Sequence, residues 1–318
     1  MKTPRPIPHR TSRGLRGRLR CLMQAVWDHR LYYLMLLPAF AAVLIFSYFP
    51  MYGIQIAFKD YKGSLGFAAS KWVGMKHFIN FFNSYNCWTL IKNTFVLSLY
   101  SFLASFPIPI ILALLLNEIR GRYKNFVQTV LYAPHFISLV VLVGMISTML
   151  SPSIGSINTM IEMLGGKKIY FMSLPSAFRH IYVWSGVWQE MGWSAVIYIA
   201  ALSAVDPQLH EAAIIDGASK LQRIWHINLP TILPTVVIMF ILSAGSLASV
   251  GQEKVLLLQN DLNLDVSEVI STYVYKRGVL HANYSFSTAI GLLNNLVSIL
   301  FLLGANWISK KATETSLF

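Results

Sequence analysis

Residues 90–117 read LIKNTFVLSLYSFLASFPIPIILALLLN, and this stretch decides the fold class. Apart from Lys92 it carries no charge, and it stays apolar for longer than the roughly 20 residues that a helix needs to cross a bilayer. A strand of a membrane barrel would be about half as long and would alternate apolar with polar residues. The stretch therefore predicts a transmembrane helix.

The same kind of apolar block recurs along the chain, at 31–52, 126–150, 179–204, 231–250 and 285–308. Of the 318 residues, 55% are hydrophobic and 12% are charged, whereas about a quarter of the residues of a soluble domain are charged. Backbone polar groups inside lipid have to be paired within the segment, which helices achieve. We predict an all-α, polytopic membrane protein with six transmembrane helices, in which residues 31–308 form one membrane domain.

The net charge of +13 is concentrated outside the apolar blocks. Lys and Arg gather in the tail 1–30, in the connection 118–125 and in the tail 309–318. Six alternating helices place these three segments on one side, and cytoplasmic segments are the ones enriched in Lys and Arg. Both termini are therefore predicted to be cytoplasmic. The charge forms no basic face with stacking aromatics, which argues against a nucleic-acid partner.

One connection, residues 205–230, reads VDPQLHEAAIIDGASKLQRIWHINLP and is longer than a tight helical hairpin needs. Asp206 is a suitable N-cap and Pro207 suits the first helical position. Gly217 can adopt the left-handed conformation that ends a helix. A second helix is expected from about Ser219. The connection thus predicts two short helices joined by a turn.

The end of this connection and its first helix carry further expectations. Leu229 and Pro230 are expected to stop the second helix and to start the next membrane block. In the first helix, the small residues Ala212 and Ala213 would let the helix sit deep in a groove of another protein, with carboxylates nearby. A plain amphipathic surface helix has the same composition, so the residues alone leave both interpretations open.

The string EAAIIDGASKLQRIWHINLP resembles the EAA motif of the permeases of ATP-binding-cassette (ABC) importers, in which EAA is followed by three residues, a glycine and a hydrophobic stretch ending in Leu-Pro. The runs around Asp216–Ala218 and Trp225–Ile227 resemble the carbohydrate branch, particularly permeases for oligosaccharides or polysaccharide fragments. The motif positions, with the two neighbours of the glycine, are Glu211, Ala212, Ala213, Asp216, Gly217, Ala218, Leu229 and Pro230.

The resemblance extends beyond the motif. YFPMYGIQIAFKDY at 48–61 and WVGMKHF at 72–78 resemble the first outside loop of the family, and KKATETSLF at 310–318 resembles its C-terminal end. It implies the fold of a type I importer permease in a bacterial inner membrane. It also implies a second homologous permease, a cytoplasmic ATPase dimer docked on the 211–218 helix and an extracytoplasmic sugar-binding protein.

The chain itself lacks the GxxxxGK[ST] loop that binds ATP phosphates. ATP and Mg are therefore expected on the partner ATPase, and no cofactor on this chain. An HExxH zinc motif fails because Ile214 stands where the second histidine belongs, and Cys21 and Cys87 match no metal-ligand spacing. We predict no metal site and no enzymatic activity.

Candidate path residues lie in the fourth block, where 181–196 read IYVWSGVWQEMGWSAV. Glu190 is the one carboxylate well inside a predicted span, where an unpaired charge is costly, so it is expected to face the bundle interior, water or a partner. Trp184 and Trp188 share one helix face, and Gln189 and Trp193 share another. These side chains suit a sugar path, by stacking and hydrogen bonding, but an interfacial tryptophan belt gives the same pattern.

Asn294 and Asn295 in the last block are polar residues in hydrocarbon, which either bond between helices or line the path. Two other classes of protein remain to be weighed. An intramembrane enzyme needs a nucleophile with a base, a carboxylate pair or a metal cluster, and Glu190 stands alone. An ion-coupled secondary transporter usually needs several buried ionisable groups and often repeated halves, which the sequence does not display.

Overall fold

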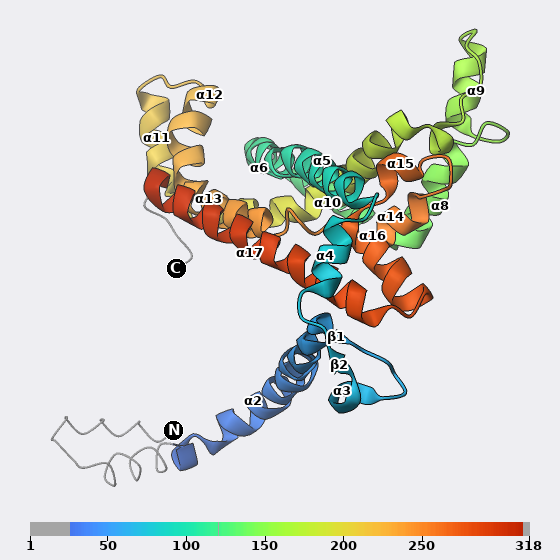
Figure 1. Cartoon of the computed structure of the whole chain (residues 1–318). Helices are drawn as coiled ribbons and strands as arrows, with labels where there is room; N and C mark the ends of the chain where they lie inside the picture. Colours follow the sequence, from blue (N-terminus) through green and yellow to red (C-terminus); the bar gives the residue numbers. More distant parts are fainter. Residues whose placement is uncertain (1–25, 120, 314–318) are drawn as a thin grey trace. The chain divides into compact units, whose positions relative to one another are not determined.

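A computed structural model describes residues 26–119 and 121–313 of the chain. Most of the predicted N-terminal tail, Arg120 and the last five residues lie outside this described part. The chain divides into two compact units, Met1–Gln55 and Ile56–Phe318, which are described separately. Apart from one short ribbon of two strands, the described residues are helical or lie in connections (Figure 1).

The first unit contains the first predicted span. Helix α2 (Arg30–Val43) continues through the π-helix η1 (Leu44–Tyr48) into the 3-10 helix η2 (Phe49–Phe58), which crosses into the second unit. No residue of α2 is buried, although its side chains are mostly apolar. A helix that is apolar on all sides and unburied by its own chain is suited to lipid or to another membrane helix.

The second unit opens with the ribbon, in which β1 (Lys59–Asp60) pairs antiparallel with β2 (Lys71–Trp72) around the short helix α3 (Gly66–Ala69). Helix α4 (Lys76–Phe82) leads to α5 (Cys87–Ser105) and α6 (Pro107–Glu118). The last two together form one apolar helical stretch of 32 residues, as predicted for 90–117. Pro107 stands at the first position of α6, a position at which proline is well tolerated.

The block 126–150 was expected to form one span, and the structure breaks it. Helix α7 (Arg122–Tyr132) runs into the 3-10 helix η3 (Ala133–Phe136), and α8 (Leu139–Met149) leaves at an angle of 97°. Pro134 favours the break because it has no N–H to continue an α-helix. Ser138 then caps α8 by accepting a hydrogen bond from the Val141 N–H.

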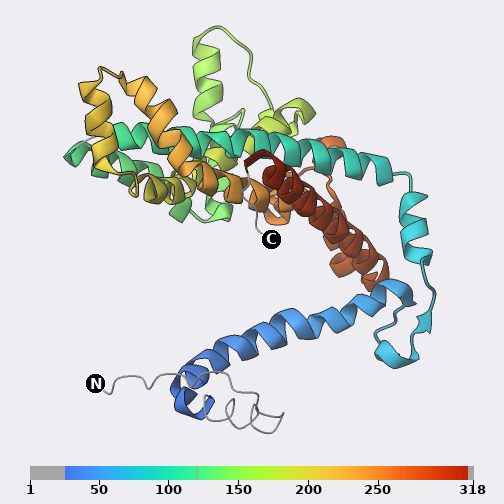
Figure 2. The same cartoon turned by 90° about the vertical axis from the view of Figure 1, so that its left-hand side faces the viewer.

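Helix α10 (Pro175–Leu202) lies at the centre of this unit and packs against α5, α6, α7 and α13 (Leu229–Gly245) (Figure 2). It follows α9 (Ser156–Met163) and the 3-10 helix η4 (Phe171–Ser173). Its buried residues include Phe178, Val183, Val187, Ala195 and Tyr198, so the core of the unit is built around this helix.

The C-terminal part of the chain contributes the remaining helices of the bundle. After α13 come the short helices α14 (Gln252–Leu258), α15 (Leu264–Ser267) and α16 (Ile270–Tyr275) and the π-helix η6 (Lys276–Leu280). The long helix α17 (Tyr284–Thr313) packs along α13 and also contacts α4 and α16. The predicted last span is therefore confirmed as a helix.

Length and apolar composition alone identify fewer spans than the six expected. In the described part, four helical stretches are long and apolar enough to cross a membrane: Arg30–Phe58, Cys87–Glu118, Lys220–Gly245 and Tyr284–Lys311. The bent pair α7–η3 and α8 makes a fifth if it is taken as one span. Helix α10, predicted as the fourth span, has 28 residues but is not among these apolar stretches. Its polar side chains can be tolerated because neighbouring helices surround it.

Candidate coupling hairpin and transport path

The connection 205–230 folds into the predicted pair of helices. Helix α11 (Pro207–Ile215) begins at Asp206, whose Oδ1 accepts a hydrogen bond from the Gln208 N–H at 2.9 Å. The turn that follows contains Gly217 at φ +77°, a conformation that residues with a Cβ rarely adopt. The expected N-cap and the expected left-handed turn are both confirmed.

The second helix differs from the prediction at its end. Helix α12 (Lys220–Arg223) starts with a capping box between Ser219 and Gln222 and continues through the π-helix η5 (Ile224–Asn228) into α13. Lys220–Gly245 is thus one helical stretch of 26 residues, and Leu229–Pro230 does not stop it. The wider π turn, in which the Leu229 N–H bonds the Ile224 carbonyl, accommodates a proline that has no N–H to donate.

The hairpin α11–α12, residues 206–223, lies at one end of the second unit, far from α9 (Figure 1). Glu211, Ala212, Asp216 and Gly217 are exposed, as is Pro230, while Ala213, Ala218 and Leu229 are half-buried. Large apolar side chains on and just after the hairpin are also exposed, and Ile215 is 85% exposed. An exposed surface with small residues, carboxylates and unburied apolar groups is suited to contact with another protein.

The candidate path residues of α10 lie on two faces. On one face, the Trp184 Nε1–H donates to the Tyr100 hydroxyl at 2.9 Å, and that hydroxyl lies 2.8 Å from His180 Nδ1. Trp188, four residues further on, is 42% exposed. Among the described residues, no hydrogen bond or ring contact joins these two tryptophans to the other candidates.

The second face of α10 meets η3. Gln189 is buried and its Nε2 donates to the Ile137 carbonyl at 2.8 Å. Glu190 Oε2 lies 2.9 Å from His135 Nδ1, and the Trp193 ring stacks on the same imidazole with centroids 4.6 Å apart. Glu190 is therefore not alone, because the bend at Pro134 brings a histidine to it.

The sequence patterns did not single out His135, although a histidine inside an apolar block is itself a signal of function. Gly192 lets α7 and α10 approach closely, because a Cβ on Gly192 would overlap the Leu131 carbonyl oxygen of α7. Close packing of α7 on α10 thus fixes the position of His135 relative to Glu190 and Trp193.

Lys254, counted from the sequence only as a loop charge, is 8% exposed. Its Nζ donates to the Tyr182 carbonyl at 2.8 Å and lies 5.0 Å from the centre of the Tyr182 ring. Burial lowers the pKa of Lys254 from 10.5 to about 8, and the negative charge of Glu190 opposes this shift. A cation thus lies buried beside the face of α10 that carries Glu190.

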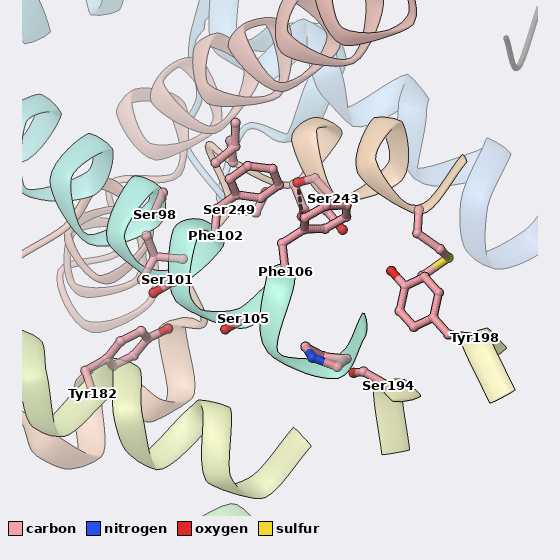
Figure 3. Close-up of a pocket in the computed structure, with 15 residues that line it drawn as sticks. Ser98, Ser101, Phe102, Ser105, Phe106, Tyr182, Ser194, Tyr198, Ser243 and Ser249 are labelled. Atoms are coloured by element: carbon pink, nitrogen blue, oxygen red, sulfur yellow. Dashed lines mark hydrogen bonds between the residues drawn. The ribbon is translucent and has the colours of Figure 1, made fainter. Parts of the chain in front are cut away.

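A cavity of about 270 Å³ lies between α5, α6, α10 and α13 (Figure 3). Aromatic rings line it together with hydroxyl groups, namely those of Ser98, Ser101, Ser105, Ser194, Ser243, Ser246 and Ser249. The buried hydroxyls of Ser98 and Ser101 have no hydrogen-bond partner among the described residues. Such a lining can bond the hydroxyls of a sugar and stack on its apolar faces.

The two asparagines of α17 have different surroundings. Asn294 Nδ2 donates to the Ala248 carbonyl at 3.0 Å and so holds the segment after α13 against α17. Asn295 is exposed. Of the two interpretations open at these positions, the hydrogen bond between elements applies to Asn294.

Residues 91–313 match the family described as the inner membrane component of binding-protein-dependent transport systems. The chain belongs to this family. It is 44% identical to the polygalacturonan/rhamnogalacturonan transport system permease protein YteP of Bacillus subtilis, over 95% of this chain and 94% of that protein. It is 42% identical to protein LplB of the same organism, over 93% of each chain.

Solved structures agree with this assignment. A bacterial ABC transporter involved in the import of the acidic polysaccharide alginate contains a chain that superposes with a TM-score of 0.85. That chain is 40% identical, and the match covers 92% of this chain and 99% of that one. The alginate transporter in complex with an alginate-bound periplasmic protein matches equally well, at 39% identity. The chain is thus a multi-pass inner-membrane permease subunit with the type I importer fold, and not an enzyme.

Proposed function

We propose that this chain, with a second homologous permease, forms the path for an oligosaccharide or polysaccharide fragment delivered by an extracytoplasmic solute-binding protein. The observation that carries the proposal is the exposed, doubly capped hairpin at one end of a bundle whose interior holds a cavity lined by hydroxyls and rings. The relatives named for polygalacturonan/rhamnogalacturonan and for alginate support this class of substrate.

The hairpin is the proposed docking site of a cytoplasmic ATPase dimer, which binds ATP and Mg while this chain binds no cofactor. Glu211, Ala212, Ala213, Asp216, Gly217 and Ala218 form the contact, with Leu229 and Pro230 at its base. Because α12 continues through η5 into α13, a displacement of the hairpin moves a helix that lines the cavity and packs along α17. Docking at one end can thus change the shape of the path inside the bundle.

The sugar path runs past the face of α10 that meets His135. Trp193, Glu190 and Gln189 lie on this face, whereas Trp184 and Trp188 contribute from the opposite face, and Asn294 and Asn295 hold or border the path from α17. Trp193 supplies a ring for stacking, and the serine hydroxyls of the cavity supply donors and acceptors.

For the orientation, both termini are proposed to be cytoplasmic. Helix α17, with Lys310 and Lys311 in its last turn, packs along α13, the helix that continues from the hairpin that an ATPase would contact. Basic residues at this end accord with the enrichment of Lys and Arg on the cytoplasmic side. Residues 1–30 and 309–318 are then cytoplasmic tails of the permease domain 31–308.

The proposal is tested by co-purification from native membranes in mild detergent. Ala212→Trp adds bulk to the exposed face of α11, and Lys167→Trp adds the same bulk at an equally exposed position in the loop after α9. We expect the wild type and Lys167→Trp to retain an ATPase and a second permease, and Ala212→Trp to lose the ATPase. A chain that purifies alone, or an ATPase retained by Ala212→Trp, contradicts the proposed docking site.

A further inference from the structure

Three titratable side chains from three elements gather along one face of α10. His135 comes from η3, Glu190 from α10 itself and Lys254 from α14. Glu190 Oε2 lies 2.9 Å from His135 Nδ1, and the negative charge of Glu190 favours the charged form of Lys254. The packing of the core explains none of the three, because apolar residues would fill the same space at a lower cost of desolvation.

Lys254 has unused hydrogen-bonding capacity. An ammonium group has three N–H donors, and among the described residues the Tyr182 carbonyl is the one acceptor within hydrogen-bond distance of Nζ. The Nζ atom lies over Gly186, 3.0 Å from the place where a Cβ would stand, so the absence of a side chain there leaves room for the ammonium. A buried cation with a single neutral acceptor favours an anion as a further partner.

Glu190 is placed to be that partner. It lies one turn after Gly186 on the same face of α10, and helical side chains lean toward the N-terminus of their helix, which is the direction of Lys254. Its side chain is 49% exposed and bonds the imidazole of His135 through one oxygen. A rotation of the Glu190 side chain therefore moves its carboxylate from His135 toward Nζ of Lys254 without a change in the backbone.

We propose that His135, Glu190 and Lys254 form a carboxylate-exchange site that selects sugars carrying a carboxylate, such as uronates. Without substrate, the Glu190 carboxylate is hydrogen-bonded to the His135 imidazole. The carboxylate of an arriving sugar takes over this hydrogen bond while the sugar ring packs beside Trp193. The Glu190 side chain then turns to Lys254. This inference rests on the proposed function. It adds that the substrate is negatively charged, and it names the residues that recognise this charge.

The charge balance favours a monoanionic carboxylate over a phosphate. In the exchange, one monoanionic carboxylate takes the place of another at His135, so the net charge of that contact does not change. A phosphate ester carries nearly two negative charges at neutral pH and would leave an excess of negative charge in a poorly hydrated site. The alginate named for the solved relative is an acidic polysaccharide, in keeping with this choice.

The test uses the complete transporter with its binding protein. Binding of tetragalacturonate and of its carboxyl-reduced, neutral counterpart is measured on the purified complex by equilibrium dialysis, and uptake of both is measured in proteoliposomes. Lys254→Met keeps the length of the side chain and removes the charge. Lys276→Met removes a cation that pairs with Glu268 at 3.1 Å and not with Glu190, and serves as the control.

We expect Lys254→Met to weaken binding of the acidic oligomer about tenfold, the effect of one moderate ionic contact, and to leave the neutral oligomer unchanged. Glu190→Gln removes the competing carboxylate, so the acidic oligomer should bind more tightly to this variant. Equal loss for both oligomers in Lys254→Met, with no gain in Glu190→Gln, would mean that Lys254 only ties α14 to α10, and it overturns the inference.

The outcomes also separate this inference from the proposed function. A wild-type transporter that prefers the neutral oligomer and still imports it with ATP contradicts the carboxylate-exchange site and leaves the importer intact. A chain that assembles with no ATPase and imports neither oligomer contradicts the proposed function itself. Lys276→Met should resemble the wild type toward both oligomers.

Discussion

The hairpin α11–α12 and the face of α10 that meets His135 differ in how far apart in sequence their interacting residues lie. The hairpin is stabilised by hydrogen bonds between residues that are close in sequence. The Asp206 side chain accepts from the Gln208 N–H, and Ser219 and Gln222 each donate a backbone N–H to the side chain of the other. On α10, the partners are distant in sequence: His135 and Glu190 lie 55 positions apart, and Tyr182 and Lys254 lie 72 positions apart.

This difference explains which region could be read from the sequence. Caps, a left-handed glycine and helical periodicity are local signals, so the hairpin was predicted almost residue by residue. The path is predicted only as a set of suitable side chains on two helices. Which of them meet depends on the bend at Pro134 and on the close packing that Gly192 permits, and neither follows from local pattern.

The largest expected effect comes from the turn of the hairpin. Gly217→Val forces a β-branched residue into φ +77°, which it tolerates poorly, and so distorts the docking surface while the membrane helices remain. We expect sugar-stimulated ATP hydrolysis to fall about 100-fold, near the upper end of typical coupling energies. The measurement is the ATPase rate of the reconstituted complex with and without loaded binding protein.

The matched control for that variant is Gly165→Val. Gly165 also has a positive φ, +82°, and lies in the loop after α9, at the end of the unit opposite the hairpin (Figure 1). Similar losses in both variants would trace the defect to general misfolding and contradict a specific role of the hairpin in coupling.

A second change acts on the path through packing. Gly192→Ala introduces a Cβ that overlaps the Leu131 carbonyl, so α7 and η3 have to move away from α10. Overpacking of this kind costs about 1–3 kcal/mol of stability. We expect a lower thermal midpoint and a loss of uptake, with the ATPase still bound in a co-purification. A variant with normal uptake would contradict the importance of the His135–α10 contact.

A third comparison separates the two faces of α10. Trp193→Ala removes the ring stacked on His135, and Trp188→Ala removes an exposed ring on the other face. We expect uptake to fall about 3- to 10-fold in Trp193→Ala, the range of one aromatic contact, and less in Trp188→Ala. Both should retain the ATPase. A larger effect of Trp188→Ala would place the path on the opposite face.

The smallest expected effect is a pH dependence that Lys254 confers. Its pKa in the folded protein is about 8, below the value of 10.5 for an exposed lysine. Between these values the folded protein binds fewer protons than the unfolded chain, so this group raises stability as pH increases through that window. Its positive charge is lost at the same time.

We therefore expect the preference for acidic over neutral oligomers to decline a few-fold between pH 7 and pH 9, as the charged fraction of a group with a pKa near 8 declines. The ratio of the two uptake rates is the measurement, and Lys254→Met should show no such decline. The same decline in Lys254→Met would assign it to another group.

Other differences between expectation and structure share one physical cause. Apolar blocks indicate where helices lie, but they do not indicate how a proline is accommodated. Pro134 produces a bend of 97°, whereas Pro230 sits in a continuous helix because the π-helix η5 precedes it. Lys254 looked like a loop charge because burial of a charge depends on which helices fold over it.

The central claim is that this permease moves an oligosaccharide with energy from ATP transmitted through the hairpin. The most direct test is uptake of labelled tetragalacturonate into proteoliposomes that contain the full complex, with binding protein outside. We expect accumulation with ATP and Mg inside, and none with a non-hydrolysable analogue or in Gly217→Val. Accumulation without ATP, driven by an ion gradient, would contradict the account and indicate a secondary transporter.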